Sequence, residues 1–253
     1  MDILFFMRHI IIGDVHGCIN EFSTLLNKLQ ITNEDKLFSV GDLVDKGPDP
    51  IGCIRLAKEM NITTVRGNHE DKPIRWLLHE QRCKITKKKN PMSSVSEEEK
   101  EIYSKLNEDD VNWLCSLPTA YKLEELNTII VHGGFFPGVD IDFQIKNRIR
   151  EVIRLRFVDE HTGNFVSVSN ADQPPNTLLW SKVYDGSYNI VYGHITHDLK
   201  QPRVDVRERD KIECVGIDTG CVTGGMLTAY ILESKSFVQV PATKQYCKCC
   251  WSE

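Results

Sequence analysis

The sequence lacks any long apolar stretch. No run approaches the roughly 18 residues that a membrane-spanning helix requires. The opening residues MDILFFMRH contain an acid at Asp2 and only a short apolar run before Arg8, which is unlike a secretory signal peptide. We therefore expect a cytoplasmic protein with no membrane partner.

A disulfide framework is also missing. The chain has nine cysteines, an odd number, and most of them stand singly. Scattered cysteines are typical of reduced, intracellular proteins, so the fold is not expected to depend on disulfides. The exception is the end of the chain, where residues 241–253 are predicted to form a tail containing Cys247, Cys249 and Cys250.

Excess positive charge is absent as well. The formal net charge is −5, with 41% hydrophobic and 26% charged residues, as in ordinary globular proteins. This balance does not indicate a broad attraction to nucleic acid, although net charge leaves a local basic patch open, and no stable nucleic-acid binding is expected. The length of 253 residues suits one large domain, which we place at residues 1–240.

Five short apolar runs end in polar residues. They are HIIIGD (9–14), KLFSVGD (36–42), NITTVRGNHE (61–70), NTIIVHGG (127–134) and YNIVYGH (188–194). Residues 19–31 and 50–60, between the first three runs, carry apolar residues at helical spacing. Alternating strands and helices predict an α/β layered fold, in which ligands bind at the carboxyl ends of the strands.

Two segments interrupt this pattern. Residues 72–118 are predicted to form a helical insertion, with one helix beginning after Ser96 and running through Leu106 and another beginning after Asn107. Residues 159–177 contain turn residues and prolines, which predict a hairpin followed by a loop.

Six side chains that can bind metal follow the five predicted strands. Carboxylate, amide and imidazole donors together suit Mn, Fe, Co or Zn, with Mn favoured, and the absence of cysteine argues against a structural zinc site. Two divalent ions sharing Asp42 would use the whole set and would activate a bridging water, so that hydroxide attacks phosphorus directly. The six predicted ligands are Asp14, His16, Asp42, Asn68, His132 and His194.

A proton donor for the leaving oxygen is predicted next to these ligands. His69 follows Asn68, and Asp45 lies near enough in sequence to Asp42 to orient it. Lys46 or Arg66 could hold phosphate oxygens. The alternatives are an exposed loop cation for Lys46 and a structural ion pair for Arg66.

The motifs GDVHG, GDLVDKGP and GNHE, followed in order by HGG, GH and DTGC, resemble those of the calcineurin-like metallophosphoesterases. The resemblance spans residues 9–232. It implies two β-sheets packed face to face and flanked by helices, an αββα sandwich. It also implies that the six residues above bind two metals and that His69 and Asp45 form the acid–carboxylate pair.

Two further stretches resemble the symmetrical diadenosine tetraphosphatases of this family: DTGCVTGGMLTA (218–229) and RLRF (154–157). They imply hydrolysis of dinucleoside polyphosphates with a symmetrical cut. Alternatives are a Ser/Thr or dual-specificity protein phosphatase, which LLWS (178–181) resembles, and a polyphosphatase or RNA-cap hydrolase. A metal-binding scaffold without turnover is disfavoured because all six ligands and His69 are present.

A basic segment could contact the substrate. Residues 144–157 are predicted to form a helix, from which Arg154 and Arg156 would grip a polyphosphate chain with their planar guanidinium groups. The alternative is a solvated cationic face.

Overall fold

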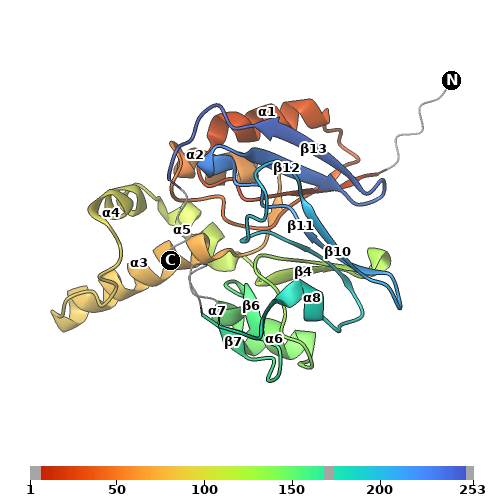
Figure 1. Cartoon of the computed structure of the whole chain (residues 1–253). Coiled ribbons are helices and arrows are strands. Elements are labelled where there is room, and N and C mark those ends of the chain that lie inside the picture. The colour runs from red at the N-terminus through yellow and green to blue at the C-terminus, as the bar shows by residue number, and fades with distance from the viewer. Residues whose placement is uncertain (1–6, 168–173, 249–253) are drawn as a thin grey trace.

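The computed structural model describes residues 7–167 and 174–248. Two five-stranded sheets pack face to face, with helices on their outer sides (Figure 1). The first sheet has the order β13 (Ser236–Pro241), β12 (Met226–Ile231), β1 (His9–Ile12), β2 (Lys36–Ser39), β3 (Thr63–Thr64). The second has the order β10 (Arg203–Arg207), β11 (Ile212–Gly216), β9 (Asn189–Tyr192), β5 (Thr128–Val131), β4 (Ala120–Leu123).

The continuous isoleucines of β1 are explained by burial on both faces. Ile10 and Ile12 pack against α1 (Ile19–Leu29) and α2 (Pro50–Glu59), on the outer side of the first sheet. Ile11 points the other way and packs with Ile130 and Val191 of the second sheet. A strand covered on both sides has no polar face, so its sequence does not alternate. The predicted αββα architecture is confirmed.

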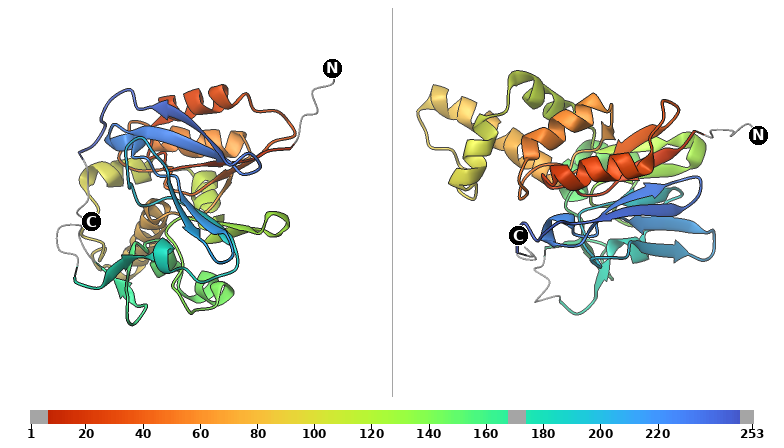
Figure 2. Two further views of the ribbon diagram at one scale, coloured as in Figure 1. Left: turned by 45° about the vertical axis from the view of Figure 1, so that its right-hand side comes forward. Right: turned by 90° about the horizontal axis from the view of Figure 1, so that it is seen from above.

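Three helices project from one end of the sandwich (Figure 2). They are α3 (Asn68–Thr86), α4 (Glu97–Ser104) and α5 (Glu108–Ser116). The predicted N-caps are confirmed, since the side chains of Ser96 and Asn107 accept hydrogen bonds from the backbone of Glu99 and Asp110 at 3.2 and 2.8 Å. We call α3, α4 and α5 the helical lobe.

The predicted helix over residues 144–157 was wrong. The chain forms two short helices, α6 (Ile141–Asn147) and α7 (Ile149–Val152), and then extends into strand β6 (Phe157–Asp159). Ile153 and Leu155 are fully buried and alternate with Arg154 and Arg156, which are partly exposed. An alternation with period two belongs to extended chain rather than to a helix, so the two arginines follow the helices instead of forming a helical ridge.

A small third sheet holds the predicted hairpin. β6 pairs antiparallel with β7 (Phe165–Val166) and with β8 (Thr177–Leu179), while residues 168–173 lie outside the described part. The remaining elements are η1 (Glu124–Leu126), α8 (Trp180–Val183) and η2 (Cys221–Thr223). None of the helices in residues 7–167 and 174–248 is long and apolar enough to cross a membrane.

The beginning of the predicted tail packs on the domain. The backbone N–H groups of Tyr246 and Cys247 donate to the carbonyl of Val222 at 3.0 and 3.1 Å. Both side chains contact the hydrophobic core beside α1. Cys249 and Cys250 lie outside the described residues.

Candidate metal centre

Strand register brings the predicted ligands to one edge of the sandwich. Ile12, Ser39 and Thr64 are neighbours at the ends of β1, β2 and β3, which run parallel. In the second sheet Val131 pairs with Tyr192 at the ends of parallel β5 and β9. The chain continues from each of these strand ends into the loop that carries a predicted ligand.

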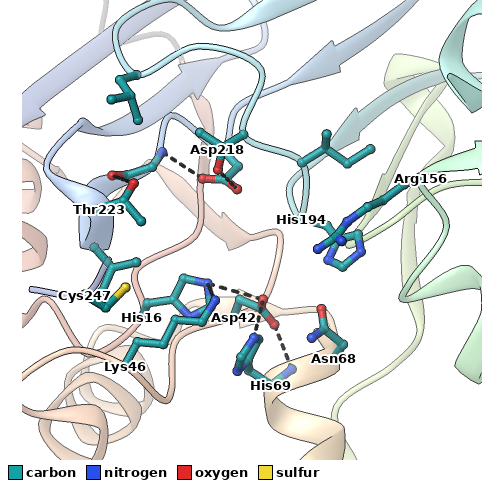
Figure 3. Close-up of a pocket in the computed structure, with 15 residues that line it drawn as sticks. His16, Asp42, Lys46, Asn68, His69, Arg156, His194, Asp218, Thr223 and Cys247 are labelled. Atoms are coloured by element: carbon teal, nitrogen blue, oxygen red, sulfur yellow. Dashed lines mark hydrogen bonds and ion pairs between the residues drawn. The ribbon is translucent and has the colours of Figure 1, made fainter. Parts of the chain in front are cut away.

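Asp42 occupies the centre of this edge (Figure 3). Its Oδ2 lies 3.2 Å from His132 Nε2 and 3.5 Å from His16 Nε2. Two sets of donor atoms, each with all distances within 4.8 Å, include Asp42: one with His16 and His69, the other with His132 and His194. Apart from His69, which pairs with Asp45, Asp42 lies between His16 on one side and His132 and His194 on the other, as a ligand that bridges two ions would.

The imidazoles of this centre are oriented like those of metal ligands. Nδ1 of His16 donates to the carbonyl of Val44 at 3.0 Å, and Nδ1 of His132 donates to that of Val40 at 2.8 Å. A carbonyl can only accept, so Nδ1 of each ring holds a proton and Nε2 is the atom that faces Asp42. Burial lowers the pKa of His132, but the Asp42 carboxylate outweighs it and raises that pKa, and Lys46 Nζ lies 3.4 Å from His16 Nε2, so both nitrogens lie where positive charge is favoured. The residues present therefore fit divalent metal ions.

Asn68 and Asp14 complete the predicted set. Asn68 is the first residue of α3, and its Oδ1 lies 3.0 Å from His132 Nε2. Asp14 is buried, and its carboxylate accepts the backbone N–H of His194 at 3.0 Å. A Cβ at Gly193 would lie 2.1 Å from Asp14 Oδ1, so this approach of the two loops requires glycine.

Backbone strain is concentrated at this edge. Five site residues have φ between +46° and +66°, a left-handed conformation that non-glycine residues seldom adopt. Such conformations persist only where the surrounding structure enforces them, and they are typical of functional sites. The five are His16, Asp42, Asp45, Lys46 and His194.

Burial and neighbouring charges set the protonation of the centre. Burial raises the pKa of Asp14, and the carboxylates of Asp218 and Asp42 raise it further. Burial alone would also raise the pKa of Asp42, but the surrounding histidines outweigh it and lower that pKa well below its usual range. Burial lowers the pKa of His194, and the nearby Arg156 adds to this effect. Asp42 is thus anionic and His194 neutral, as metal ligands must be.

Glu70 supports the centre and was not singled out from the sequence. Its fully buried carboxylate accepts backbone N–H groups of Asp42 and Gly67 at one oxygen (2.8 and 2.9 Å) and of Leu43 at the other (2.7 Å). Burial, together with the charge of Asp42, raises its pKa to about 7. Glu70 lies three residues after Gly67, the N-cap of α3, and accepts its backbone N–H, which is half of a capping box. Because glycine has no side chain to complete the box, the sequence carries no clear signal for this role.

His69 and Asp45 are paired as the resemblance implied. His69 Nδ1 donates to Asp45 Oδ2 at 2.9 Å, which leaves Nε2 facing Asp42 Oδ2 at 4.0 Å. The backbone N–H of His69 also donates to Asp42 Oδ1 at 3.0 Å. On the far side of Asp45, the hydroxyl of the buried Tyr103 in α4 donates to the same carboxylate at 3.3 Å.

The four predicted substrate-binding cations separate into two pairs. Lys46 and Arg156 line the cavity over the centre and lie on opposite sides of Asp42 (Figure 3). Arg66 instead donates to the carbonyl of Cys115 at 2.8 Å, and Arg154 donates to Asp71 at 3.3 Å. Neither Arg66 nor Arg154 lines this cavity.

The cavity walls are polar around the metal centre and more apolar beyond it. Asp218, whose carboxylate accepts from Thr196 and from the backbone of Gly220, forms part of the polar wall. The less polar part contains Ile195, Leu199, Val222, Thr223 and Cys247.

Comparison with known proteins agrees with this geometry. The family model for the calcineurin-like phosphoesterases matches residues 7–215. The chain is 30% identical to an asymmetrical bis(5'-nucleosyl)-tetraphosphatase of Oceanobacillus iheyensis, over 95% of this chain and 94% of that protein. It is 25% identical to a symmetrical bis(5'-nucleosyl)-tetraphosphatase of Wigglesworthia glossinidia brevipalpis, over 92% of this chain and 99% of that protein.

A solved structure has the same fold. The crystal structure of a proposed diadenosine tetraphosphatase superposes with a TM-score of 0.74, at 24% identity, and covers 94% of this chain and 95% of that one. The paired sheets and flanking helices are those of the metallophosphoesterase fold.

Proposed function

Because this chain belongs to the calcineurin-like phosphoesterase family, we propose that it hydrolyses dinucleoside polyphosphates, with diadenosine tetraphosphate as the representative substrate. The observation that carries the proposal is the carboxylate of Asp42, shared by two sets of donor atoms beneath one cavity. The relatives named bis(5'-nucleosyl)-tetraphosphatase, symmetrical or asymmetrical, support the substrate class.

Proteins of this family use divalent metal ions, and we propose that two such ions bind here, with Mn²⁺ favoured. The first ion would use Asp14, His16 and Asp42, and the second Asp42, Asn68, His132 and His194. When bound, such a pair activates water and neutralises phosphoryl charge.

The chain's own groups hold the substrate and move the proton. Lys46 and Arg156 contact phosphate oxygens from opposite sides of Asp42, and the fixed charge of Arg156 suits a polyanionic chain. His69, held by Asp45, gives its Nε2 proton to the leaving phosphate oxygen. Leu199 and Val222 provide an apolar surface for a nucleobase.

A substrate panel tests the proposal. The purified protein would be stripped with chelator, reloaded with Mn²⁺, and assayed for kcat/KM on diadenosine tetraphosphate, inorganic polyphosphate, capped RNA and a phosphopeptide. We expect the dinucleotide to be the best substrate. Efficient turnover of the phosphopeptide alone would contradict the proposal and favour a protein phosphatase.

Product analysis on the same sample determines where the chain is cut. The symmetrical cut, which stays a prediction from residues 154–157 and 218–229, yields ADP alone, whereas an asymmetrical cut yields ATP and AMP. Chromatography of early time points separates the two, before any secondary hydrolysis of ATP.

A further inference from the structure

A second group of metal-binding side chains lies beside α1, apart from the centre at Asp42. Cys18 is the N-cap of α1, Glu21 lies in its first turn, and Cys221 begins η2. All three side chains are almost completely buried. One donor atom from each lies within 4.8 Å of the other two.

Glu21 has an unsatisfied oxygen at this position. Its Oε1 accepts three hydrogen bonds, from the backbone and hydroxyl of Thr243 and from the hydroxyl of Tyr246, at 2.7–2.9 Å. Its Oε2 is buried and has no hydrogen-bond partner among the described residues. Burial raises the pKa of Glu21, but the hydrogen bonds from Thr243 and Tyr246 outweigh it and lower that pKa, so the carboxylate is anionic. A buried anionic oxygen without a partner is costly, and a cation would remove that cost.

We propose that Cys18, Glu21 and Cys221 form a second metal site, which takes a thiophilic divalent ion such as Zn²⁺. Two thiolates and one carboxylate are ordinary zinc ligands, with bond lengths of about 2.0–2.3 Å. Donors around a tetrahedral zinc therefore lie roughly 3.5–4 Å apart, and the three donors of this group lie within 4.8 Å of one another. The hydrogen bonds to Oε1 hold the carboxylate in place, as outer groups commonly do for metal ligands.

The site would tie together three segments near the cavity. Cys18 follows the loop that carries His16, and Cys221 follows the loop that carries Asp218. Glu21 connects both to the C-terminal segment through Thr243 and Tyr246. A bound ion would fix the two loops relative to each other, and its binding does not depend on the substrate proposed above.

Cobalt absorption tests the site without measuring activity. Co²⁺ bound to thiolate absorbs strongly by charge transfer from sulfur, whereas the donors around Asp42 contain no sulfur. The tail thiols must first be removed, because Cys247 lines the active-site cavity. The background protein is accordingly the triple variant Cys247→Ser, Cys249→Ser, Cys250→Ser, reduced and freed of metal.

In this background we expect the sulfur band to appear on titration with Co²⁺ and to saturate at one equivalent of thiolate-bound ion. Cys221→Ala should abolish the band. The matched control is Cys214→Ala, which removes a buried cysteine of the second sheet and should retain the band. Asp42→Asn should also retain the band, which separates this site from a failure of the active site.

Absence of the band in the folded background protein, or its persistence in Cys221→Ala, would overturn the proposal. X-ray absorption of the zinc-loaded background carrying Asp42→Asn gives an answer even if Cys221→Ala does not fold. Sulfur neighbours at about 2.3 Å are expected. A shell of nitrogen and oxygen alone would rule the site out.

Discussion

The hydroxyl of Tyr103 lies 3.3 Å from both carboxylate oxygens of Asp45. Tyr103 comes from the helical lobe, whereas Asp45 orients His69 in the proposed proton transfer. The lobe therefore contributes directly to the acid–carboxylate pair. Trp76 of α3 packs against the Tyr103 ring, at 5.8 Å between ring centroids, and helps to hold it there.

Tyr103→Phe should lower kcat about three- to tenfold, because one hydrogen bond to a buried carboxylate contributes about 1 kcal/mol. We expect bound metal and KM to stay unchanged and the loss to be larger for poor leaving groups. The control is Tyr121→Phe, at an exposed position in β4. Equal rates for Tyr103→Phe and the unmodified protein would show that the contact does not assist His69.

His69→Asn should slow the hydrolysis of poor leaving groups by roughly 10²–10⁴-fold, because the leaving oxygen loses its proton donor. A nitrophenyl ester needs little protonation and should be slowed much less, while metal content stays the same. The comparison is made by kcat on alkyl and nitrophenyl esters, with His79→Asn, farther along α3, as the control. The same slowing for both esters would argue against the role of His69 as the acid.

Asp42→Asn should remove most of the bound metal and cost several kcal/mol of transition-state stabilisation, about 10³-fold or more in kcat/KM. The amide of Asn carries no charge, so its oxygen is a poor ligand to share between two cations. Metal analysis and kcat/KM on diadenosine tetraphosphate measure the two effects. A variant with normal metal content and nearly normal rates would mean that Asp42 does not bridge two ions.

Two substitutions test which arginine contacts the substrate: Arg156→Ala and its matched control Arg154→Ala. The two positions are two residues apart in the sequence but have different surroundings. Arg156 lines the cavity, so its loss should raise KM for diadenosine tetraphosphate about tenfold or more, as expected for a charged hydrogen bond. Arg154 is paired with Asp71, so its loss should lower stability with a smaller effect on KM. Steady-state kinetics and urea unfolding distinguish the two effects, and equal KM values for both variants would contradict this assignment.

Protonation of Asp35 in acid should lower the free energy of unfolding. The Arg8 guanidinium, at 2.8 Å from Asp35 Oδ1, is the largest factor that lowers the Asp35 pKa, to about 2. The pKa of Asp35 is thus lower in the folded chain than its unfolded value of about 3.9. The ionised carboxylate therefore stabilises the fold above about pH 4, and this stabilisation is lost as the pH falls towards 2.

One pKa unit corresponds to about 1.4 kcal/mol, and solvent screening at the partly exposed Arg8 reduces the effect, so the expected contribution at neutral pH is about 1 kcal/mol. Asp35→Asn should therefore be less stable at pH 7 and should show a weaker loss between about pH 5 and pH 2. Urea unfolding is measured in chelator, so that acid release of metal does not contribute. Parallel pH profiles for the two proteins would contradict the assignment.

Several features of the fold were readable from local patterns. The runs HIII and TIIV predicted strands, and Ser96 and Asn107 predicted helix starts, because strand propensity and capping depend on neighbouring residues in the chain. The edge position of the six proposed ligands followed from the same strands. Their roles as ligands stay a prediction, although the structure brings them together.

Other features needed the folded chain. Glu70 binds the backbone of the loop after β2, and Tyr103 reaches Asp45 across 58 residues of sequence. The arginines Arg154 and Arg156 belong to one short motif, yet one pairs with Asp71 and the other lines the cavity. Nothing local distinguishes them, because the difference depends on which segments pack nearby.

Local patterns specify the strands that lead to the site, the helix caps and the residue types at the strand ends, since periodicity and turn chemistry act over a few residues. Packing between distant segments decided which oxygens and nitrogens face one another at Asp42 and which cations reach the cavity. It also decided that Cys18 and Cys221 meet beside Glu21. These are contacts between distant segments, and they are set by how two sheets pack.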